Sequence, residues 1–196
     1  MTTVDPIIRL RAAVGRGSPS SDFDLNPDFR PAGLRLRPAA VLVAFQAGET
    51  PRLILTKRAS GLQHHPGQIA FPGGKLEPTD ASAIDAALRE AGEEVGLPRR
   101  KVEVLGALPP HETVTGFTVT PVLGWISDAF TPSREIGEVD EVFSVPFSHI
   151  ADPANYRIES RFLRGKRRRF LAVPYGPYYI WGATARILRT LAEAMG

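Results

Sequence analysis

The sequence predicts an α+β fold in which helices pack against a mixed β-sheet. Strand-like runs come first, a single strong helical pattern follows in mid-chain, and further strand-like runs precede a last amphipathic helix. This grouping of strands and helices is typical of the α+β class. The chain has 196 residues, of which 43% are hydrophobic, and this is enough for one domain with a buried core.

The first 37 residues form a separate N-terminal segment, and we place the main domain at residues 38–196. The segment starts with the helical pattern IIRLRAAV and continues as a tether rich in Gly, Ser, Pro and Asp. PAAVLVAFQ and PRLILTKR are β-rich runs separated by AGET, which predicts a hairpin. GQIAFPGG predicts a short strand that ends in a turn.

One strong helix is predicted over residues 81–95. A side-chain oxygen of Thr79 or Asp80 is expected to accept hydrogen bonds from the first-turn amides. Gly96 stands where a residue in the left-handed conformation commonly ends a helix.

The second half of the chain contains three more strand-like runs, KVEVLGAL, TPVLGWI and EVFSVPF. RFLRGKRRRFLAVPY then predicts a hairpin that turns at Arg164 and Gly165. IWGATARILRTLAEAM predicts a last helix with an apolar stripe that faces the core. The stripe consists of Trp181, Ile187, Leu188 and Leu191.

Composition excludes several classes of protein. The chain has no cysteine, so disulfides, thiolate metal sites and a cysteine nucleophile are ruled out. Its N-terminus lacks the apolar run of a secretory signal, and the apolar runs are too short to span a bilayer. We therefore expect a cytoplasmic protein without a membrane partner. The net charge is +3, and the basic excess is concentrated in RIESRFLRGKRRR. This stretch is a patch for nucleic acid, a basic hairpin that meets a small phosphorylated ligand, or a solvated basic turn.

Three acidic residues crowd into REAGEE within the predicted mid-chain helix. Glu90, Glu93 and Glu94 are three or four residues apart and project from one side of that helix. Such like-charged pairs weaken an isolated helix by about 0.2–0.5 kcal/mol each, and Arg89 alone cannot neutralise three carboxylates. Clustered carboxylates without cysteine suit Mg²⁺ or Mn²⁺. A solvated acidic face is the alternative, but the preceding FPGG turn, whose glycines let the main chain approach a ligand, favours a metal site.

The stretch from Gly74 to Leu97 resembles the Nudix box, the signature G-x5-E-x7-R-E-U-x-E-E-x-G-U in which U is a bulky aliphatic residue. The core R-E-x-x-E-E-x-G-L matches closely. Asp80 stands where the signature has Glu, the next spacing is one residue longer, and Ala91 is small for position U. The resemblance implies a mixed sheet sandwiched between helices (an α/β/α sandwich) and a hydrolase of nucleoside diphosphates linked to another moiety.

The preceding stretch ILTKRASGLQHHPGQIAFPGG resembles a second motif, which marks the coenzyme A diphosphatase branch of the Nudix family. Gln63 stands where that motif has Arg, and a permanent positive charge is therefore missing there. The resemblance extends from about residue 38 to the C-terminus. The residues that match the motif in register are Leu55, Thr56, Arg58, Ala59, Gly67, Phe71, Pro72, Gly73 and Gly74.

The resemblance also implies roles for residues of the box. Glu90 and Glu94 would hold a divalent metal ion, with Glu93 as a further ligand or water partner and the Gly74 carbonyl as a backbone ligand. Arg89 would orient Glu93. We expect Glu90, Glu93, Glu94 and Arg89 to be the catalytic residues, and which Glu acts as general base stays open.

For the substrate, Arg58 and Lys57 lie on a strand that leads into the site and are the expected phosphate contacts. His65, Gln63 and Phe71 are further expected contacts. The alternative for Lys57 and His65 is simple solvent exposure.

Several other residues keep two interpretations. Glu138 or Glu141 would add an acid to the site or would form an ordinary strand end. Tyr178, Tyr179 and Trp181 would stack on an adenine or would serve packing. The RGKRRR turn would receive the 3′-phosphate of coenzyme A or would be solvated.

The leading hypothesis is metal-dependent cleavage of coenzyme A or acyl-CoA into 3′,5′-ADP and (acyl-)4′-phosphopantetheine. The nearest alternative is a Nudix hydrolase of ADP-ribose or a (deoxy)nucleoside triphosphate, which Gln63 favours. A non-catalytic module that binds nucleotides or RNA is a third class, and the three carboxylates argue against it. We expect a small nucleotide as partner and no nucleic acid, and a homodimer is left open.

Overall fold

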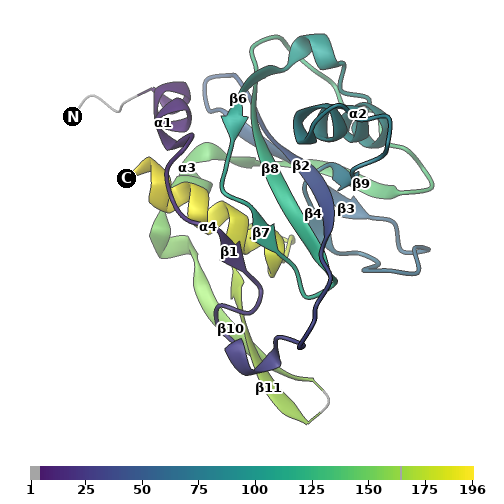
Figure 1. Ribbon diagram of the computed structural model, residues 1–196. Coiled ribbons are helices and arrows are strands. Elements are labelled where there is room, and N and C mark those ends of the chain that lie inside the picture. Colours follow the sequence, from purple (N-terminus) through teal and green to yellow (C-terminus); the bar gives the residue numbers. More distant parts are fainter. Residues whose placement is uncertain (1–4, 164) are drawn as a thin grey trace.

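The computed structural model describes residues 5–163 and 165–196 and contains a mixed β-sheet with helices on both faces (Figure 1). The helices are α1 (Pro6–Ala13), α2 (Ala83–Val95), α3 (Phe147–Ala151) and α4 (Ala183–Met195), with 3₁₀ turns η1 (Pro27–Phe29), η2 (Arg99–Lys101) and η3 (Pro153–Asn155). The strands are β1 (Ser20–Ser21), β2 (Arg37–Gln46), β3 (Arg52–Arg58), β4 (Ile69–Ala70), β5 (Gly73–Lys75), β6 (Glu103–Ala107), β7 (His111–Glu112), β8 (Phe117–Ile126), β9 (Val139–Pro146), β10 (Arg157–Leu163) and β11 (Lys166–Ala172). Within the described part of the chain, no helix is both long and apolar enough to cross a membrane.

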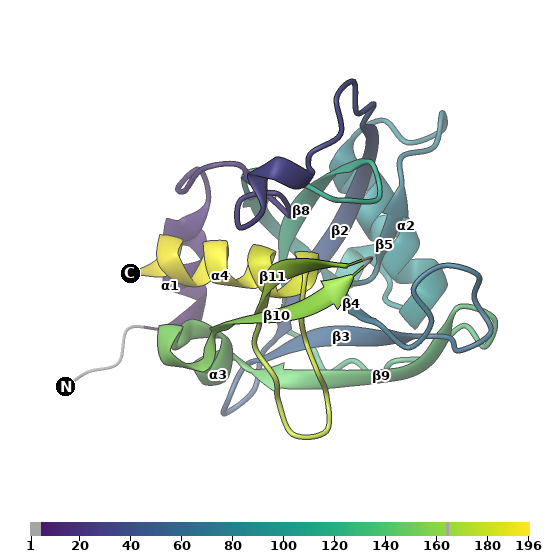
Figure 2. The ribbon, with the colours of Figure 1, turned by 90° about the horizontal axis from the view of Figure 1, so that it is seen from below.

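The alternation of side chains along β2 explains the layered architecture. Ala39, Val43 and Phe45 pack with α1, α3 and α4 in one hydrophobic cluster, and Ala40 and Leu42 pack with α2 in a second cluster on the opposite face. The two views of the ribbon show α2 and α4 on opposite sides of the sheet (Figures 1 and 2). This confirms the α+β fold with a sheet sandwiched between helices.

The sheet contains both parallel and antiparallel pairs. β2 and β8 run parallel over ten residue pairs, from Arg37 opposite Phe117 to Gln46 opposite Ile126. The predicted hairpin between β2 and β3 is confirmed, but only two residue pairs join these strands next to the turn. β3 then pairs with β9 along its whole length.

The sequence predicts one short strand before the glycine turn, and this prediction is wrong in detail. Two short strands are present, with Phe71 and Pro72 between them. β4 pairs with the far end of β3, and β5 pairs with the first half of β2. The segment 69–75 therefore bridges the place where β2 and β3 separate, and it carries the glycine turn to α2.

The N-terminal segment packs onto the rest of the chain. Leu10 and Ala13 of α1 are fully buried in the cluster that contains α4, and β1 pairs in parallel with β7. A buried polar contact also holds β1 in place, since Ser20 Oγ lies 2.9 Å from Nδ1 of the buried His111 on β7. The domain boundary at residue 37 stays a prediction.

Strands β10 and β11 form the predicted basic hairpin, which projects from the sheet at the bottom of Figure 1. Of its predicted turn, Gly165 is described and Arg164 lies outside the described residues. Asn26 anchors the hairpin, because its side chain donates to the carbonyl of Arg169 and accepts from the amide of Arg169. The last helix begins at Ala183, so Trp181 precedes it rather than forming part of its stripe.

Candidate active site

Helix α2 starts and ends at residues with clear capping roles. Ser82 is the N-cap, and its Oγ accepts a hydrogen bond from the amide of Asp85 at 3.2 Å. The prediction that Thr79 or Asp80 caps this helix is therefore wrong. The prediction for Gly96 is confirmed, since it ends the helix in the left-handed conformation with φ 67°.

The three carboxylates of α2 differ sharply in exposure. Glu94 is 5% exposed, whereas the side chains of Glu90 and Glu93 are 15% and 58% exposed. Glu94 points to the sheet, where its Oε2 accepts a hydrogen bond from the amide of Gly73 at 3.2 Å. A row of charges on one side of the helix thus runs from solvent at Glu93 into the protein at Glu94.

Arg89 connects two of these carboxylates to Asp80. Its Nε and Nη2 lie 3.0 and 3.1 Å from the two carboxylate oxygens of Asp80, and its Nη1 contacts Glu90 and Glu93 at 3.1 and 3.0 Å. Nη2 also donates to the carbonyl of Lys75. One planar guanidinium therefore fixes the side chains on both sides of the site, a geometry that lysine cannot reproduce.

The function of Asp80 was not predicted from the sequence. Its carboxylate is only 4% exposed and accepts from the amide of Glu77 as well as from Arg89, and these bonds hold its pKa below the ordinary value. The usable signal was its place in the signature, where the outer acid precedes Arg89. Cap propensity pointed elsewhere because an Asp before a helix commonly bonds to first-turn amides.

The two glycines of the turn bring the main chain against the carboxylates. A Cβ atom at Gly74 would stand 2.3 Å from Oε1 of Glu90, and one at Gly73 would stand 2.5 Å from the carbonyl oxygen of Ala40. Gly73 also has φ 157°, a conformation that favours glycine. A Cβ atom at Gly73 would clash with the main chain of β2, and one at Gly74 would displace the Glu90 carboxylate, so both glycines are needed for this arrangement.

Burial perturbs the acids that face the glycine turn. The pKa of Glu94 is raised to about 7, and desolvation is the main cause. The nearby Glu90 and Glu138 carboxylates contribute to this rise, whereas the Gly73 amide and Arg58 oppose it. Burial likewise raises the pKa of Glu90, although Arg89 opposes this shift. Shifts of this kind in a cluster of acids are typical of catalytic and ion-binding sites.

Two residues from other elements reach the carboxylates. Arg58 lies at the end of β3, and its positive charge lowers the pKa of Glu94. The Nε atom of Arg58 is buried without a hydrogen-bond partner. Glu138 lies in the loop before β9, and its negative charge raises the pKa of both Glu90 and Glu94. The sequence left Glu138 between two interpretations because it is more than 40 residues from the helix, and only the fold brings it near.

The carboxylates of α2 and the glycine turn offer oxygen donors to a divalent cation. Among residues 5–163 and 165–196, no three acidic or histidine side chains converge closely enough to form a ready-made metal cluster. Glu90 and Glu94 nevertheless flank the Gly73–Gly74 main chain, all donors are oxygens, and burial makes their negative charges costly without a cation. These residues fit Mg²⁺ or Mn²⁺ as ligands.

The structure separates the residues expected to contact substrate. Lys57 and Arg58 project from opposite faces of β3, so only Arg58 faces α2. Gln63 and His65 lie exposed in the loop 59–68, where His65 adopts φ 55° and partial burial together with Arg58 lowers its pKa. Phe71 is 4% exposed and packs in the core, because the bridging segment turns its ring inward, so in this conformation it is a packing residue.

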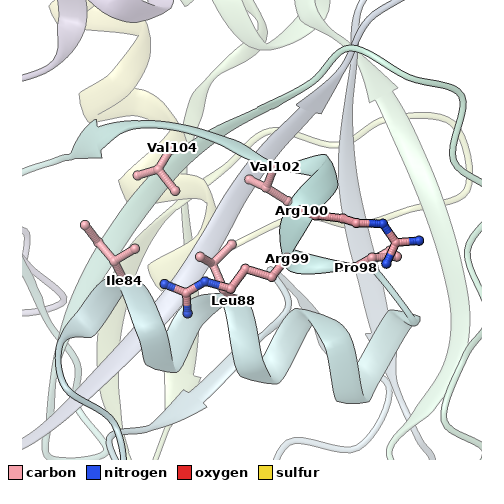
Figure 3. Close-up of a pocket in the computed structure, with 7 residues that line it drawn as sticks. All are labelled: Ile84, Leu88, Pro98, Arg99, Arg100, Val102 and Val104. Carbon is pink, nitrogen blue, oxygen red and sulfur yellow. The ribbon is translucent and has the colours of Figure 1, made fainter.

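One cavity lies away from the carboxylates. It has a volume of about 690 Å³ and lies between α2 and the segment 98–104 (Figure 3). Its floor is apolar, with Ile84, Leu88 and Val104, and none of the acids discussed above lines it. Because it contains neither the acids nor the glycine turn, we assign it no part in the chemistry.

The sheet, the glycine turn and the carboxylate helix together are those of a hydrolase of the Nudix class. Residues 35–162 match the family model described as NUDIX domain, and the chain belongs to the Nudix family. It is a Nudix hydrolase, and its activity is hydrolysis of a nucleoside diphosphate derivative.

Three known proteins illustrate the relationship. The "Uncharacterized Nudix hydrolase NudL" of Enterobacter sp. (strain 638) is 45% identical over 172 residues, which are 88% of this chain and 90% of that protein. The protein of the same name from Salmonella paratyphi B (strain ATCC BAA-1250 / SPB7) is 44% identical with the same coverage. The crystal structure of a MutT/nudix family protein from Enterococcus faecalis covers 82% of this chain and 62% of its own, with a TM-score of 0.54 and 15% identity, and shows likeness in fold.

Proposed function

We propose that this protein hydrolyses the diphosphate bond of coenzyme A or acyl-CoA, giving 3′,5′-ADP and (acyl-)4′-phosphopantetheine. The observation that supports it is the motif from Leu55 to Gly74, which resembles that of the coenzyme A diphosphatase branch. In space this motif runs from the end of β3 to the glycine turn, and both Arg58 and the Gly73 amide act on Glu94.

We further propose that a divalent metal ion is required, as is general among Nudix hydrolases. Glu90 and Glu94 would hold it, with Glu93 and the carbonyl of Gly74 as further ligands. When bound, the ion would neutralise charge on the diphosphate and lower the pKa of a coordinated water molecule.

The side chains around this position have separate tasks in the proposal. Arg89 holds Glu90 and Glu93 in place, and the Gly73 amide holds Glu94. The guanidinium of Arg58, on the face of β3 toward Glu94, meets a non-bridging phosphate oxygen of the substrate. One of the carboxylates accepts the proton of the attacking water molecule, and the kinetics of single Glu→Gln variants assign it.

A second substrate class is favoured by one specific residue. Gln63 takes the place of the motif's Arg and lies exposed in the loop next to the site, so one cation that could meet a phosphate is missing. ADP-ribose and nucleoside triphosphates, which lack the 3′-phosphate of coenzyme A, are therefore the alternative substrates.

The test is to incubate the full chain with Mg²⁺ or Mn²⁺ and, separately, coenzyme A, acyl-CoAs, ADP-ribose and nucleoside triphosphates, and to identify the products. We expect 3′,5′-ADP from coenzyme A, no turnover with EDTA, and a loss of about 100-fold or more in Glu94→Gln. Glu193→Gln is the matched control, since Glu193 is an exposed acid of α4, the helix on the opposite face of the sheet from α2. If coenzyme A stays intact while ADP-ribose or a triphosphate is cleaved, the branch assignment is wrong.

A further inference from the structure

A second cavity lies on the sheet face opposite α2. It has a volume of about 380 Å³ and opens between the ends of β3 and β9 and the segment that precedes α4. That segment crosses β3 and β9 in the view of Figure 2. Its walls combine three aromatic rings, those of Tyr178, Tyr179 and Trp181, with two charged side chains, Lys57 and Glu141.

The register of the sheet explains why the two charged residues meet there. Lys57 stands opposite Glu141 in the antiparallel pair of β3 and β9, so both side chains point to the same face. The neighbouring Arg58 points to the other face, where it acts on Glu94. A ligand in this cavity is therefore separated from the carboxylates of α2 by the edge of the sheet.

The aromatic wall is held in place before any ligand binds. Main-chain hydrogen bonds close a tight turn between Tyr175 and Tyr178 and pair Val173 with Ile180. The ring of Tyr178 stacks on Phe143 at 3.6 Å between centroids, and its hydroxyl donates to Glu141 at 2.5 Å. A preformed wall of this kind loses little conformational freedom on binding.

Arg161, a residue of the basic hairpin, contacts the rings of Tyr179 and Trp181. The guanidinium of Arg161 lies 5.5 Å from the ring centroids of both Tyr179 and Trp181. The hydroxyl of Tyr179 donates to Glu159, which lies on β10 together with Arg161. These contacts orient the rings and leave both of them in the cavity wall.

We propose that this cavity binds the adenine base of the nucleotide substrate. Aromatic faces stack on a planar base, the carboxylate of Glu141 accepts hydrogen bonds from an exocyclic amine, and Lys57 donates to a ring nitrogen. A phosphate is a poor occupant, because Glu141 repels it. The inference rests on the proposed function only in that the substrate is an adenine nucleotide.

The position of the cavity suits a substrate that extends from one face of the sheet to the other. Gly67 lines the cavity, and its amide donates to the carbonyl of Arg58 at 3.0 Å. A base in the cavity thus places the attached ribose and phosphates at the Gly67 edge, next to Arg58. The exposed loop 59–68 lies along this path, which gives Gln63 and His65 a place beside the sugar and phosphates.

Fluorescence of Trp181 provides a test that does not require turnover. The chain has two tryptophans, and Trp125 is 8% exposed in β8, so a stacked base should quench Trp181 alone. The probes are 5′-AMP, 3′,5′-ADP and ribose 5-phosphate, titrated into the full chain in EDTA. We expect saturable quenching by both adenine nucleotides, none by ribose 5-phosphate, and its loss in Trp181→Phe.

Matched variants separate stacking from structural damage. Tyr179→Leu should raise the dissociation constant of 5′-AMP by roughly fivefold or more, since one base stack is typically worth that much. Tyr179→Phe keeps the ring and should stay within about twofold of the unaltered protein. Phe162→Leu is the control at an exposed aromatic residue of the hairpin outside the cavity.

The outcomes distinguish this inference from the proposed function. Quenching by adenine nucleotides in a protein that leaves coenzyme A intact keeps the adenine site and overturns the substrate assignment. Turnover of coenzyme A without quenching, and with the same KM in Tyr179→Leu, keeps the substrate and overturns the adenine site. Equal quenching by ribose 5-phosphate also overturns it.

Discussion

Oε1 of Glu90 lies where a Cβ atom of residue 74 would stand, at 2.3 Å from that ideal position. Gly74 is therefore the residue that lets this half-buried carboxylate reach the main chain of β5. The contact joins two parts of the Nudix signature that are 16 positions apart in the sequence. It explains sterically why a glycine stands at the start of the signature.

Gly74→Ala should displace Glu90 and impair hydrolysis. A methyl group at this position forces the carboxylate away by more than an ångström, and misplacement on that scale costs about 100-fold in rate. Steady-state kinetics on the best substrate of the panel measure the effect. Gly48→Ala, in the β2–β3 turn where a Cβ meets only ordinary contacts, should retain full activity. Equal rates in the two variants would show that the position of Glu90 is unimportant.

Arg89→Lys should lower both stability and activity. A single ammonium cannot bridge Asp80, Glu90 and Glu93 as the guanidinium does, and the nearly buried Asp80 would lose its partner. We expect a decrease of about 1–3 kcal/mol in the free energy of unfolding, measured by urea denaturation.

The control for Arg89→Lys is Arg11→Lys in α1. Arg11 pairs with Glu103 on the surface, where both side chains are largely exposed, and such a pair contributes less than about 1 kcal/mol. If the two substitutions cost the same, Arg89 is only another surface arginine and not the connection between the acids of the site.

The sequence predicted helix α2 and its C-terminal end well because the information is local. Glu90, Glu93, Glu94 and Arg89 are at helical spacing, and Gly96 ends the helix where a left-handed residue was expected. The fold class followed from the order of strands and helices. These features depend on neighbours within about one helical turn or on element order, which a sequence displays directly.

The contributions from distant segments could not be predicted in the same way. Strand β8 pairs in parallel with β2 although about 80 residues separate them, and no local pattern encodes that choice. Glu138 reaches the carboxylates only through the β3–β9 pairing.

Asp80 was assigned to a cap because Arg89, which competes for its carboxylate, binds across nine residues of sequence. Phe71 was expected to contact the substrate because the inward turn of the bridging segment depends on β2 and β3, which a local pattern does not display.

The stability of the metal-free protein should fall as the pH rises between about 4.5 and 7. The pKa of Glu94 is raised from its ordinary value of 4.5 to about 7, so in this window the folded state binds more protons than the unfolded state. The stabilising effect of the bound proton is complete below pH 4.5 and is lost as the pH rises through 7. At most about 3 kcal/mol is involved, from 1.36 kcal/mol per pKa unit.

Urea denaturation in EDTA, compared between the unaltered protein and Glu94→Gln, isolates this contribution. The variant carries no ionisable group at position 94, so its stability relative to the unaltered protein should increase from pH 5 to pH 8. Glu90 contributes in the same direction, since its pKa is also raised by burial. A difference between the two proteins that stays constant with pH would show that Glu94 titrates normally.

Leu10→Ala tests whether the N-terminal segment is a tether or an integral part of the domain. Leu10 is fully buried between α1 and the cluster around α4, and truncation of such a leucine typically costs about 2–5 kcal/mol. Ile8, on the same helix but 57% exposed, provides the control, and Ile8→Ala should change the free energy of unfolding by less than about 0.5 kcal/mol. Equal and small effects in the two variants would support an independent segment that ends near residue 37. A large effect confined to Leu10 would extend the folded domain to α1.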